Sequence, residues 1–366
     1  MKFSCNKIDI DNSLDIVLKA VPNKTTMPVL ECVVLETVEN GIKLITNDMS
    51  LGIEARFNAD VEEEGIILVN AKMLFDIIRK LPNETLSFEA DDNNNILIFC
   101  GKSKFNIMGM DHEEFPLLPE IERDKKIVMS QYTLKEMIRQ TIFSISNNES
   151  NKIYTGELFE VREDNIKITS LDLHRASIRN STLKDSYEDI KCVIPGKTLM
   201  EVMKILSSEV DDEVEIFFTN NHVLFQIPDI IIISRLIEGN FYNVNQMINN
   251  DYEIKVKINK RELLESVDRA TLLLRESESK PVIVNINGDE IKLEMNTKIG
   301  SMDENIMVEK EGKDLRIGFD PKFIIAALKV IEDEYVYLYF CNAKSPCFIK
   351  DEDSYIYMIL PVKIDV

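Results

Sequence analysis

The chain has 366 residues, of which 45% are hydrophobic, and its 43 basic and 64 acidic side chains give a formal net charge of −21. This length fits two or three domains of roughly 100 to 200 residues, and no run reaches the about 18 apolar residues that would cross a bilayer. The acidic balance argues against indiscriminate nucleic-acid binding, although it does not forbid a local positive face.

The N-terminal segment MKFSCNKIDIDNS has no apolar h-region or small-residue cleavage site, so it does not resemble a secretory signal, and we expect a cytoplasmic protein. The cysteines are scattered without CxxC spacing, which favours reduced core thiols over disulfides. The histidines lie far apart in the sequence, so we expect neither a metal site nor a bound cofactor.

The first third of the chain contains two predicted helices. The first covers NSLDIVLKAV, residues 12–21, and is followed by the acidic turn ETVENG and the strand-like GIKLITNDMS, which together are typical of a hairpin. The second begins near Val69 in VNAKMLFDIIRKLP. Its apolar positions have helical spacing and are predicted to face the core: Leu74, Ile77, Ile78 and Leu81. Its polar face carries Lys72 and Arg79, and residues seven apart project from the same side of a helix.

The middle third repeats this order. A helix is predicted over YTLKEMIRQTIF, residues 132–143, with Lys135 and Arg139 on its polar side. The turn EVREDN and the strand NIKITSLDLH follow, and then the helix of VIPGKTLMEVMKIL begins near Val193. Lys197 and Lys204 lie seven apart on its polar face. Its predicted core positions are Leu199, Val202, Met203 and Leu206.

The last third repeats the order again. Helix KRELLESVDRATLLL, residues 260–274, precedes the turn NINGDE and the strand EIKLEMNTKI, and IGFDPKFIIAALKVI then carries Lys322 and Lys329. The predicted core positions of this last helix are Ile324, Ala327, Leu328 and Ile331. Lys72, Lys197 and Lys322 lie 125 positions apart, a period that indicates duplicated domains because solenoids and propellers repeat about every 20 to 50 residues.

The predicted fold is therefore α+β, with three tandem copies of a domain in which two helices pack on antiparallel sheets. Irregular linkers, EEFPLLPEIERDKK and GNFYNVNQMINNDYE, separate the copies. We expect domains at residues 1–125, 126–250 and 251–366.

The repeated basic pair has two interpretations. On a single helix, lysine and arginine are common exposed residues, and a merely solvated face would explain them. A basic pair that occurs in all three copies instead favours one positive surface. Such a surface would contact the phosphates of nucleic acid without recognising the base sequence.

Several segments, in order and at matching spacing, resemble one protein family. They are MKFSCNK, TTMPVLECVVLE, KLITNDMSLGIEAR, FDIIRKLP, KSKFNIMGMDHEEFP, TGELFE, TSLDLHRAS, VIPGKTLMEVMKIL, SRLIEGNF and YMILPVKI. Together they look like the beta subunit of bacterial DNA polymerase III, the family of replication sliding clamps. The resemblance implies a ring-shaped head-to-tail homodimer of three-domain subunits, with duplex DNA threaded through the hole and held without sequence specificity.

The family resemblance also implies what the protein does. The ring has no catalytic residues and no enzymatic activity, and it gives processivity by tethering the DNA polymerase III alpha subunit. The clamp loader, repair factors and other proteins with a clamp-binding motif are further expected partners, and a membrane is not.

The resemblance assigns site residues by position. The loop residue Lys24 corresponds to a cationic DNA contact, whereas the equivalent loop cation of the second domain falls at Asn151, next to Lys152. The predicted DNA contacts are Lys24, Lys72, Arg79, Lys135, Arg139, Lys197, Lys204, Lys322 and Lys329. The predicted partner-peptide pocket comprises Leu171, Asp172, Leu173, His174, Arg175, Ala176, Tyr242, Gln246, Met247, Met358, Leu360, Pro361 and Val362.

The subunit interface is assigned in the same way. Phe105 and Ile107 correspond to an edge strand of domain one, and Leu272 and Leu273 to the part of domain three that it meets. The alternative is that all four are ordinary core residues, since Phe, Ile and Leu are so often buried.

Two segments of the predicted pocket depart from the family's usual sequence. LDLHRA stands where the family usually has Thr-Asp-Gly-His-Arg-Leu, and FYNV where it has Phe-Pro-Asp-Tyr. Leucine for glycine and alanine for leucine change the shape of a pocket, so a different peptide preference is expected.

Two other functions fit parts of the sequence. Asp172 and His174 would point to one face of a strand and form an acid/base pair, as in a hydrolase, but no GxSxG or Gly-rich phosphate loop accompanies them. The second alternative is a clamp-derived protein-binding scaffold that does not load onto DNA. The net charge of −21 and the departures of LDLHRA and FYNV from the family's usual sequence are compatible with it.

Overall fold

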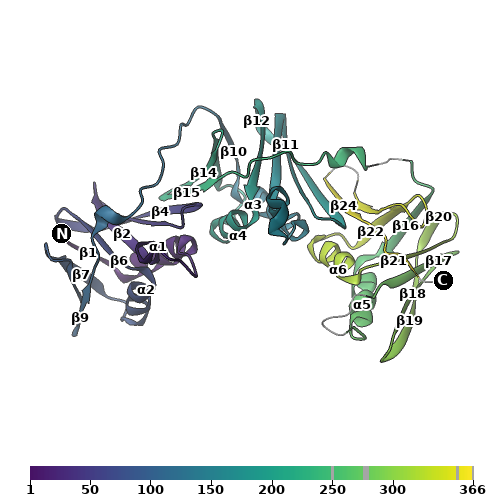
Figure 1. Ribbon diagram of the computed structural model, residues 1–366, viewed down its shortest axis with the longest axis horizontal. Coiled ribbons are helices and arrows are strands. Elements are labelled where there is room, and N and C mark those ends of the chain that lie inside the picture. The colour runs from purple at the N-terminus through teal and green to yellow at the C-terminus, as the bar shows by residue number, and fades with distance from the viewer. Residues whose placement is uncertain (249–250, 275–279, 352–353, 365–366) are drawn as a thin grey trace. The chain divides into compact units, whose positions relative to one another are not determined.

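The computed structural model of the chain (Figure 1) describes residues 1–248, 251–274, 280–351 and 354–364. It divides into two compact units, Met1–Gln131 with Lys204–Leu236, and Tyr132–Met203 with Ile237–Val366. The expected domain limit at residue 250 lies outside the described residues.

The helices of the described chain follow the predicted order. They are α1 (Lys7–Val17), α2 (Ala71–Lys80), α3 (Gln131–Arg139), α4 (Gly196–Ile205), α5 (Lys260–Thr271) and α6 (Pro321–Val330). Short 3-10 turns are η1 (Leu18–Ala20), η2 (Pro28–Glu31), η3 (His112–Glu114), η4 (Ile142–Ser144), η5 (Glu149–Thr155) and η6 (Val244–Gln246). The second helix of each copy, namely α2, α4 and α6, therefore lies where the sequence predicted it.

The first helix of each copy differs from the prediction in its bounds, and α1 differs at both ends because it also stops at Val17 rather than at Val21. Helix α1 begins at Lys7 rather than Asn12, and an ion pair of 2.7 Å between Lys7 and Asp11 spans its first turn. Helix α3 ends at Arg139 because Thr141 leaves the helical region, with φ at −125°, and its hydroxyl donates back to the carbonyl oxygen of Met137 at 2.7 Å. Helix α5 ends at Thr271, before the predicted Leu274.

The first unit contains two antiparallel sheets. One has the order β5-β1-β7-β8-β9, so β9 is an edge strand, and the other has the order β10-β13-β14-β15-β4-β3-β2-β6. The strands are β1 (Lys2–Asn6), β2 (Cys32–Val38), β3 (Gly41–Asn47), β4 (Leu51–Asn58), β5 (Asp60–Glu63), β6 (Ile66–Asn70), β7 (Thr85–Ala90), β8 (Asn95–Cys100), β9 (Ser103–Met108), β10 (Lys126–Ser130), β13 (Glu213–Phe218), β14 (His222–Ile227) and β15 (Ile230–Arg235). Helices α1 and α2 contact each other, and α1 packs on β3 and β4.

The second unit also contains two antiparallel sheets. Their orders are β11-β12-β24-β23-β22-β16-β20 and β19-β18-β17-β21, which makes β19 an edge strand. The strands are β11 (Gly156–Leu171), β12 (Arg175–Pro195), β16 (Ile254–Asn259), β17 (Val282–Asn287), β18 (Glu290–Thr297), β19 (Gly300–Met307), β20 (Glu309–Gly312), β21 (Leu315–Phe319), β22 (Tyr335–Phe340), β23 (Cys347–Lys350) and β24 (Tyr355–Ile359). Helices α5 and α6 contact each other here, as α1 and α2 do in the first unit.

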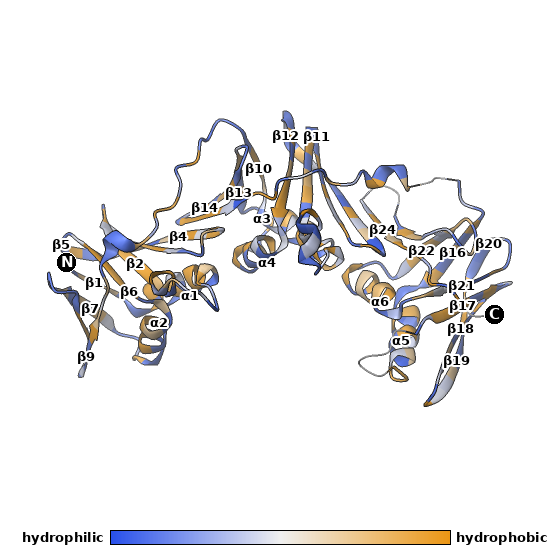
Figure 2. Cartoon of the chain, in the orientation of Figure 1, coloured by the Kyte–Doolittle hydropathy of each residue, from blue (hydrophilic) through white to orange (hydrophobic). Residues whose placement is uncertain are grey.

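The predicted apolar stripes face the core. Twelve residues on or directly after α2, α4 and α6 were predicted to be buried. Ten of them are buried, and Ile77 and Met203 are half-buried. Strands such as β8 and β22 alternate between buried and more exposed residues, and the strands in Figure 2 carry both orange and blue segments. The binary pattern of the sequence is thus the pattern of the folded chain.

The predicted hairpin turns lie at matching positions in the three copies. Asn40 and Gly288 have φ of 63° and 57° between their strands, and Glu163 has φ of 52° within β11. An ion pair of 2.8 Å joins Glu160 to Lys167. Seven residues of extended strand would separate them by about 23 Å, so the chain reverses direction inside β11.

The six cysteines are all free, and four of them are buried, as expected for reduced core thiols. Among the described residues, no group of three or more His, Cys, Asp or Glu side chains is placed to hold a metal ion. No described helix is long and apolar enough to cross a membrane.

Candidate functional site

The three repeated helices each begin directly after a strand, and this fixes where their first lysine lies. The side chain of Asn70 accepts a hydrogen bond from the backbone N–H of Met73 at 2.9 Å, which caps α2. Asp320 caps α6 in the same way, by accepting from the N–H of Lys322 at 2.9 Å. Lys72, Lys197 and Lys322 each occupy the second position of their helix.

A lysine in the first turn of a helix is not favoured by the helix itself. The positive end of the helix dipole lies there, and cations stabilise the C-terminal turn instead, by about 0.3–1 kcal/mol. Arg79, Lys204 and Lys329 do lie in the last turns of α2, α4 and α6. The helix dipole therefore favours the last-turn cations and does not favour the first-turn lysines.

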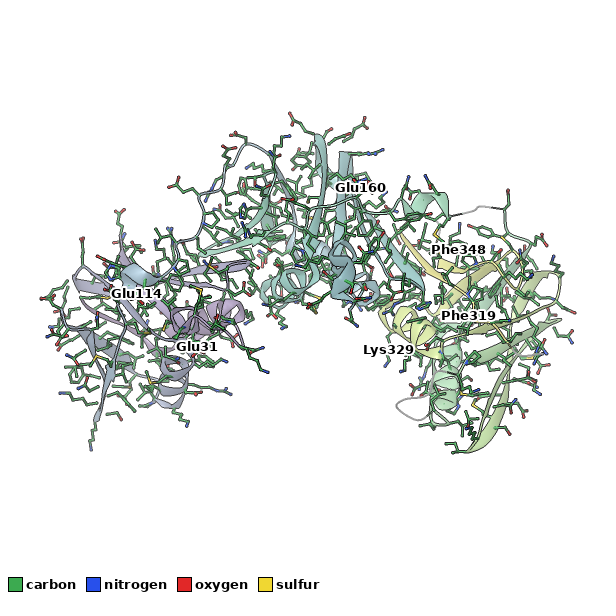
Figure 3. The ribbon with its side chains drawn as sticks, in the orientation of Figure 1. Glu31, Glu114, Glu160, Phe319, Lys329 and Phe348 are labelled. Carbon is green, nitrogen blue, oxygen red and sulfur yellow. The ribbon has the colours of Figure 1, made fainter. Side chains whose placement is uncertain are left out.

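The cations of α2 and α6 are open to solvent. Lys72, Arg79, Lys322 and Lys329 are exposed, and no carboxylate oxygen of the described residues lies within 4.0 Å of their nitrogen atoms. Figure 3 labels Lys329 on α6. These four charges are available for a ligand.

The other predicted DNA contacts are placed differently. Lys24 is exposed in the loop between η1 and η2. Lys197 and Lys204 are exposed on α4 and Lys135 is half-buried on α3, and each of these three makes an interaction within the chain.

Several cations on or next to the first helix of each copy are held by carboxylates. Arg139 binds Glu136 and lies 3.2 Å from Glu332, and the hydrogen bond to Glu136 is the main reason that the pKa of Arg139 is raised. Three further pairs are Lys19 with Asp15, Arg261 with Glu265, and Arg269 with Glu304. Helices α2 and α6 thus leave more positive charge for a ligand than these ion-paired side chains do.

The residues predicted for the peptide pocket come together in the second unit. Ala176 on β12 pairs with Met358 on β24, and the N–H of Leu360 donates to the carbonyl oxygen of His174 at 2.8 Å. Leu171, Ala176, Met247 and Met358 belong to one apolar cluster with Phe241 and Val244. Three segments that are far apart in the sequence therefore build one site.

Part of this site is exposed and apolar. The side chain of Leu173 is 78% exposed, that of Tyr242 46% and that of Val362 39%. Gln246 is also exposed, and Leu360 and Pro361 are half-buried. Exposed apolar residues gathered over an apolar cluster are typical of a docking surface rather than of a solvated loop.

Arg175 is held by groups that the sequence did not predict. Its guanidinium carbon lies 4.7 Å from the ring centre of Phe323 on α6 and 5.6 Å from that of Phe143, while Nε donates to Asp172 at 3.0 Å. His174 stacks on the same Phe323 ring at 5.8 Å. The sequence signal for Phe323 was limited to its position directly after Lys322 on α6.

The hydrolase alternative does not fit the geometry at Asp172. One carboxylate oxygen accepts from the backbone N–H groups of His174 and Arg175, at 2.7 and 3.0 Å, and the other accepts from the Arg175 side chain. The carboxylate therefore closes a turn and does not orient the His174 ring.

The residues predicted for the subunit interface are not core residues. Phe105 lies on the edge strand β9 and is 37% exposed, and Leu272, directly after α5, is 78% exposed. Ile107 and Leu273 are half-buried. The interpretation of all four as ordinary core residues is wrong, because Phe105 on the edge strand and Leu272 are exposed in the isolated chain, although Leu273 packs against the core cluster of the second unit.

Comparisons with known proteins match nearly the whole chain to one family. The N-terminal, central and C-terminal domain models of the DNA polymerase III beta subunit match residues 1–119, 128–243 and 245–363. The beta sliding clamp of Staphylococcus epidermidis is 32% identical over 375 residues, with 99% of each chain covered.

Solved structures give the same answer. The crystal structure of a putative DNA polymerase III beta subunit from Eubacterium rectale is 49% identical, with a TM-score of 0.97 and 99% of each chain covered. That of the DNA polymerase sliding clamp from Bacillus subtilis is 32% identical, with a TM-score of 0.97 and 100% of each chain covered. The chain belongs to the DNA polymerase III beta subunit family, the bacterial sliding clamps.

Proposed function

We propose that two copies of this chain close head to tail into a ring around duplex DNA and that the ring slides along the duplex without reading its sequence. Topology, not affinity, would retain the ring, so each phosphate contact can be weak. The three segments 1–125, 126–250 and 251–366 would be the repeated domains of each subunit.

The observation that carries this proposal is the lysine at the second position of α2, α4 and α6. Helix stability disfavours a cation there, yet all three copies keep one. Each helix carries a second cation seven residues, or about two turns, further on: Arg79, Lys204 or Lys329. The two cations of a helix are therefore about 10 Å apart along its axis. Phosphates of a duplex are the ligand that such pairs fit. Phosphates of a duplex are also what Lys24 and Lys135 would contact, and Arg139 would contribute less because Glu136 and Glu332 pair with it.

The edge strands support the head-to-tail contact. Strand β9 carries Lys104 beside Phe105, whereas the edge strand β19 carries Asp303 and the exposed Met307. Pairing β9 of one subunit with β19 of another, next to Leu272 and Leu273, would cover both edges and bring opposite charges together.

The exposed apolar site around Leu173 would bind short peptides of other proteins. The DNA polymerase III alpha subunit, the clamp loader and repair factors with clamp-binding motifs are the proposed partners. The chain would itself catalyse nothing and would work in the cytoplasm, where chromosomal DNA is replicated in bacteria.

Two measurements test the proposal against a scaffold that never loads. The mass in solution should be twice the 42.1 kDa of one chain. A clamp loader with ATP should place the protein on nicked circular DNA. A monomer in solution, or a dimer that the loader cannot place on the circle, would favour the scaffold.

A further inference from the structure

A second, polar cavity borders the peptide site in the second unit. Its volume is about 180 Å³, enough for more than one water-sized group, and it lies where residues 242–245 pass over β11 and β12. Glu160, Arg162, Lys167 and Lys191 line it, so it carries three cations and one carboxylate in a chain whose net charge is −21. Figure 3 labels Glu160 at this sheet.

The charges inside this cavity are only partly balanced. The two oxygens of Glu160 lie 2.8 Å from Lys167 Nζ and 3.2 Å from Lys191 Nζ. Burial alone would raise the pKa of Glu160, but the two lysines outweigh it and the pKa is lowered, so the carboxylate stays ionised. Arg162 is exposed and has no carboxylate oxygen of the described residues within 4.0 Å.

Comparison with the first copy separates the structural part of this cluster from the rest. Glu36 and Lys43 form the same ion pair, at 2.6 Å, at the equivalent positions of β2 and β3. The residue directly across the sheet from Glu36 is Ile66, whereas the residue across from Glu160 is Lys191. The Glu160–Lys167 pair therefore belongs to the fold, while Lys191 is an added charge.

The cavity and the peptide site are continuous. Thr169 lines the cavity and Leu171 belongs to the peptide site, and these two residues lie on the same face of β11, about 7 Å apart. Leu158 and Val244 line the cavity and also belong to the apolar cluster of the peptide site. A peptide whose apolar anchor lies over Leu171 and Leu173 would reach the cavity with a neighbouring residue.

We propose that this cavity binds the carboxylate of an acidic residue that flanks the apolar anchor of a docking peptide. Arg162 and Lys191 would supply the charge-assisted hydrogen bonds. The inference deepens the peptide-binding role proposed above and rests on it. A free oxyanion such as inorganic phosphate has the same chemistry, and the test separates the two sources.

The test uses the full-length protein and 15-residue synthetic peptides spanning the DNA polymerase III alpha subunit of the same organism. Peptides whose binding is lost in Leu173→Asp define the apolar anchor. Each flanking residue is then replaced in turn by Asp, Asn or Lys, and affinity is measured by fluorescence anisotropy. At one flanking position, Asp should bind the unaltered protein roughly fivefold more tightly than Asn, as expected for a partly exposed charge pair.

The cavity variant is Arg162→Gln with Lys191→Gln, which leaves the half-buried Glu160–Lys167 pair in place. It should abolish the preference for Asp and leave binding of the Asn peptide unchanged. The matched control, Lys80→Gln with Lys298→Gln, removes two exposed charges elsewhere and should keep the preference. Inorganic phosphate should compete with the Asp peptide more than with the Asn peptide.

Each other outcome overturns the inference. If peptides bind through Leu173 without any preference for Asp, or keep that preference in the cavity variant, the cavity does not bind the peptide although the peptide site stands. Phosphate that binds without displacing the Asp peptide would assign the cavity to a free anion. If no peptide depends on Leu173, the proposed peptide site fails as well.

Discussion

Arg269 on α5 donates from Nε to the carboxylate of Glu304 on β19 at 3.0 Å, so the charge of this helix is neutralised within the chain. The hydrogen bond to Glu304 raises the pKa of Arg269, and the same contact lowers the pKa of Glu304. The neighbouring helix α6 leaves Lys322 and Lys329 without such partners among the described residues. Neighbouring helices of one fold are therefore expected to differ in their contribution to DNA binding.

The first prediction concerns the salt dependence of DNA binding. Lys322→Gln with Lys329→Gln should reduce the slope of log affinity against log salt by about one per lysine. Each phosphate contact that is removed means that about one counterion fewer is released when the protein binds DNA. The measurement is duplex binding by fluorescence anisotropy over a series of salt concentrations.

Arg269→Gln is the control for that measurement. It removes one cation from α5, which lies in the same unit as α6. Its slope should stay close to that of the unaltered protein. Equal reductions for Arg269 and for a lysine of α6 would mean that ion pairing within the chain does not decide which cations meet the duplex.

The repeated helices show what the sequence could predict. Their apolar spacing and basic pair occur three times, so α2, α4 and α6 could be placed from periodicity alone. The start of α1 was missed because IDIDNS alternates between apolar and polar residues as a strand does. An ion pair between Lys7 and Asp11 spans the first turn that the structure adds to this helix.

The site was predictable only in part. The three peptide-site segments were found through the family resemblance, and their residues do meet in the structure. Phe143 and Phe323 were missed because only the tertiary fold brings them to Arg175. The role of β19 as an edge likewise depends on sheet order, which local sequence patterns do not encode.

The second prediction concerns subunit association. Phe105→Arg should shift the mass in solution toward the 42.1 kDa of a single chain, because a charge would then lie in the apolar contact of the β9 edge. Light scattering after size-exclusion chromatography measures it. Leu117→Arg, at a leucine that is 87% exposed, should leave the mass unchanged. Dissociation by both variants would show that the effect is not specific to this edge.

The third prediction separates peptide docking from DNA binding. His174→Ala removes the ring that stacks on Phe323 and should weaken binding of partner peptides several-fold, since aromatic pairs contribute about 0.5–1.5 kcal/mol. Binding of duplex DNA in the absence of a loader should be unchanged, because His174 is not one of the predicted DNA contacts. A loss of some turnover activity, with peptide binding intact, would instead support an enzyme.

The fourth prediction concerns Glu157, whose side chain is fully buried on β11 where the first copy has the buried Val33. Burial raises its pKa from 4.5 to about 8, against the opposing effect of the nearby Thr141 hydroxyl. That hydroxyl donates to Met137, and neither carboxylate oxygen has a hydrogen-bond partner among the described residues. A buried carboxyl group with this pKa is protonated at neutral pH.

The sign of the pH dependence follows from these values. Between pH 4.5 and about 8 the folded chain holds a proton that the unfolded chain has lost, so the free energy of unfolding falls as pH rises through this window. Glu157→Gln should be more stable than the unaltered protein by a few kcal/mol above pH 8 and should lose most of the pH dependence. Urea unfolding at pH 6 and pH 9 measures both; parallel curves for the two proteins would contradict the burial argument.

The central claim is that topology retains the protein on DNA, and one measurement tests it most directly. The protein is loaded onto a nicked circular duplex, unbound protein is removed, and the circle is then cut once with a restriction enzyme while retention is followed by gel filtration. A ring should stay on the intact circle and leave the linear DNA through its ends within the time of the cut. Equal retention on circular and linear DNA would contradict the account, because the contacts themselves would then be holding the duplex.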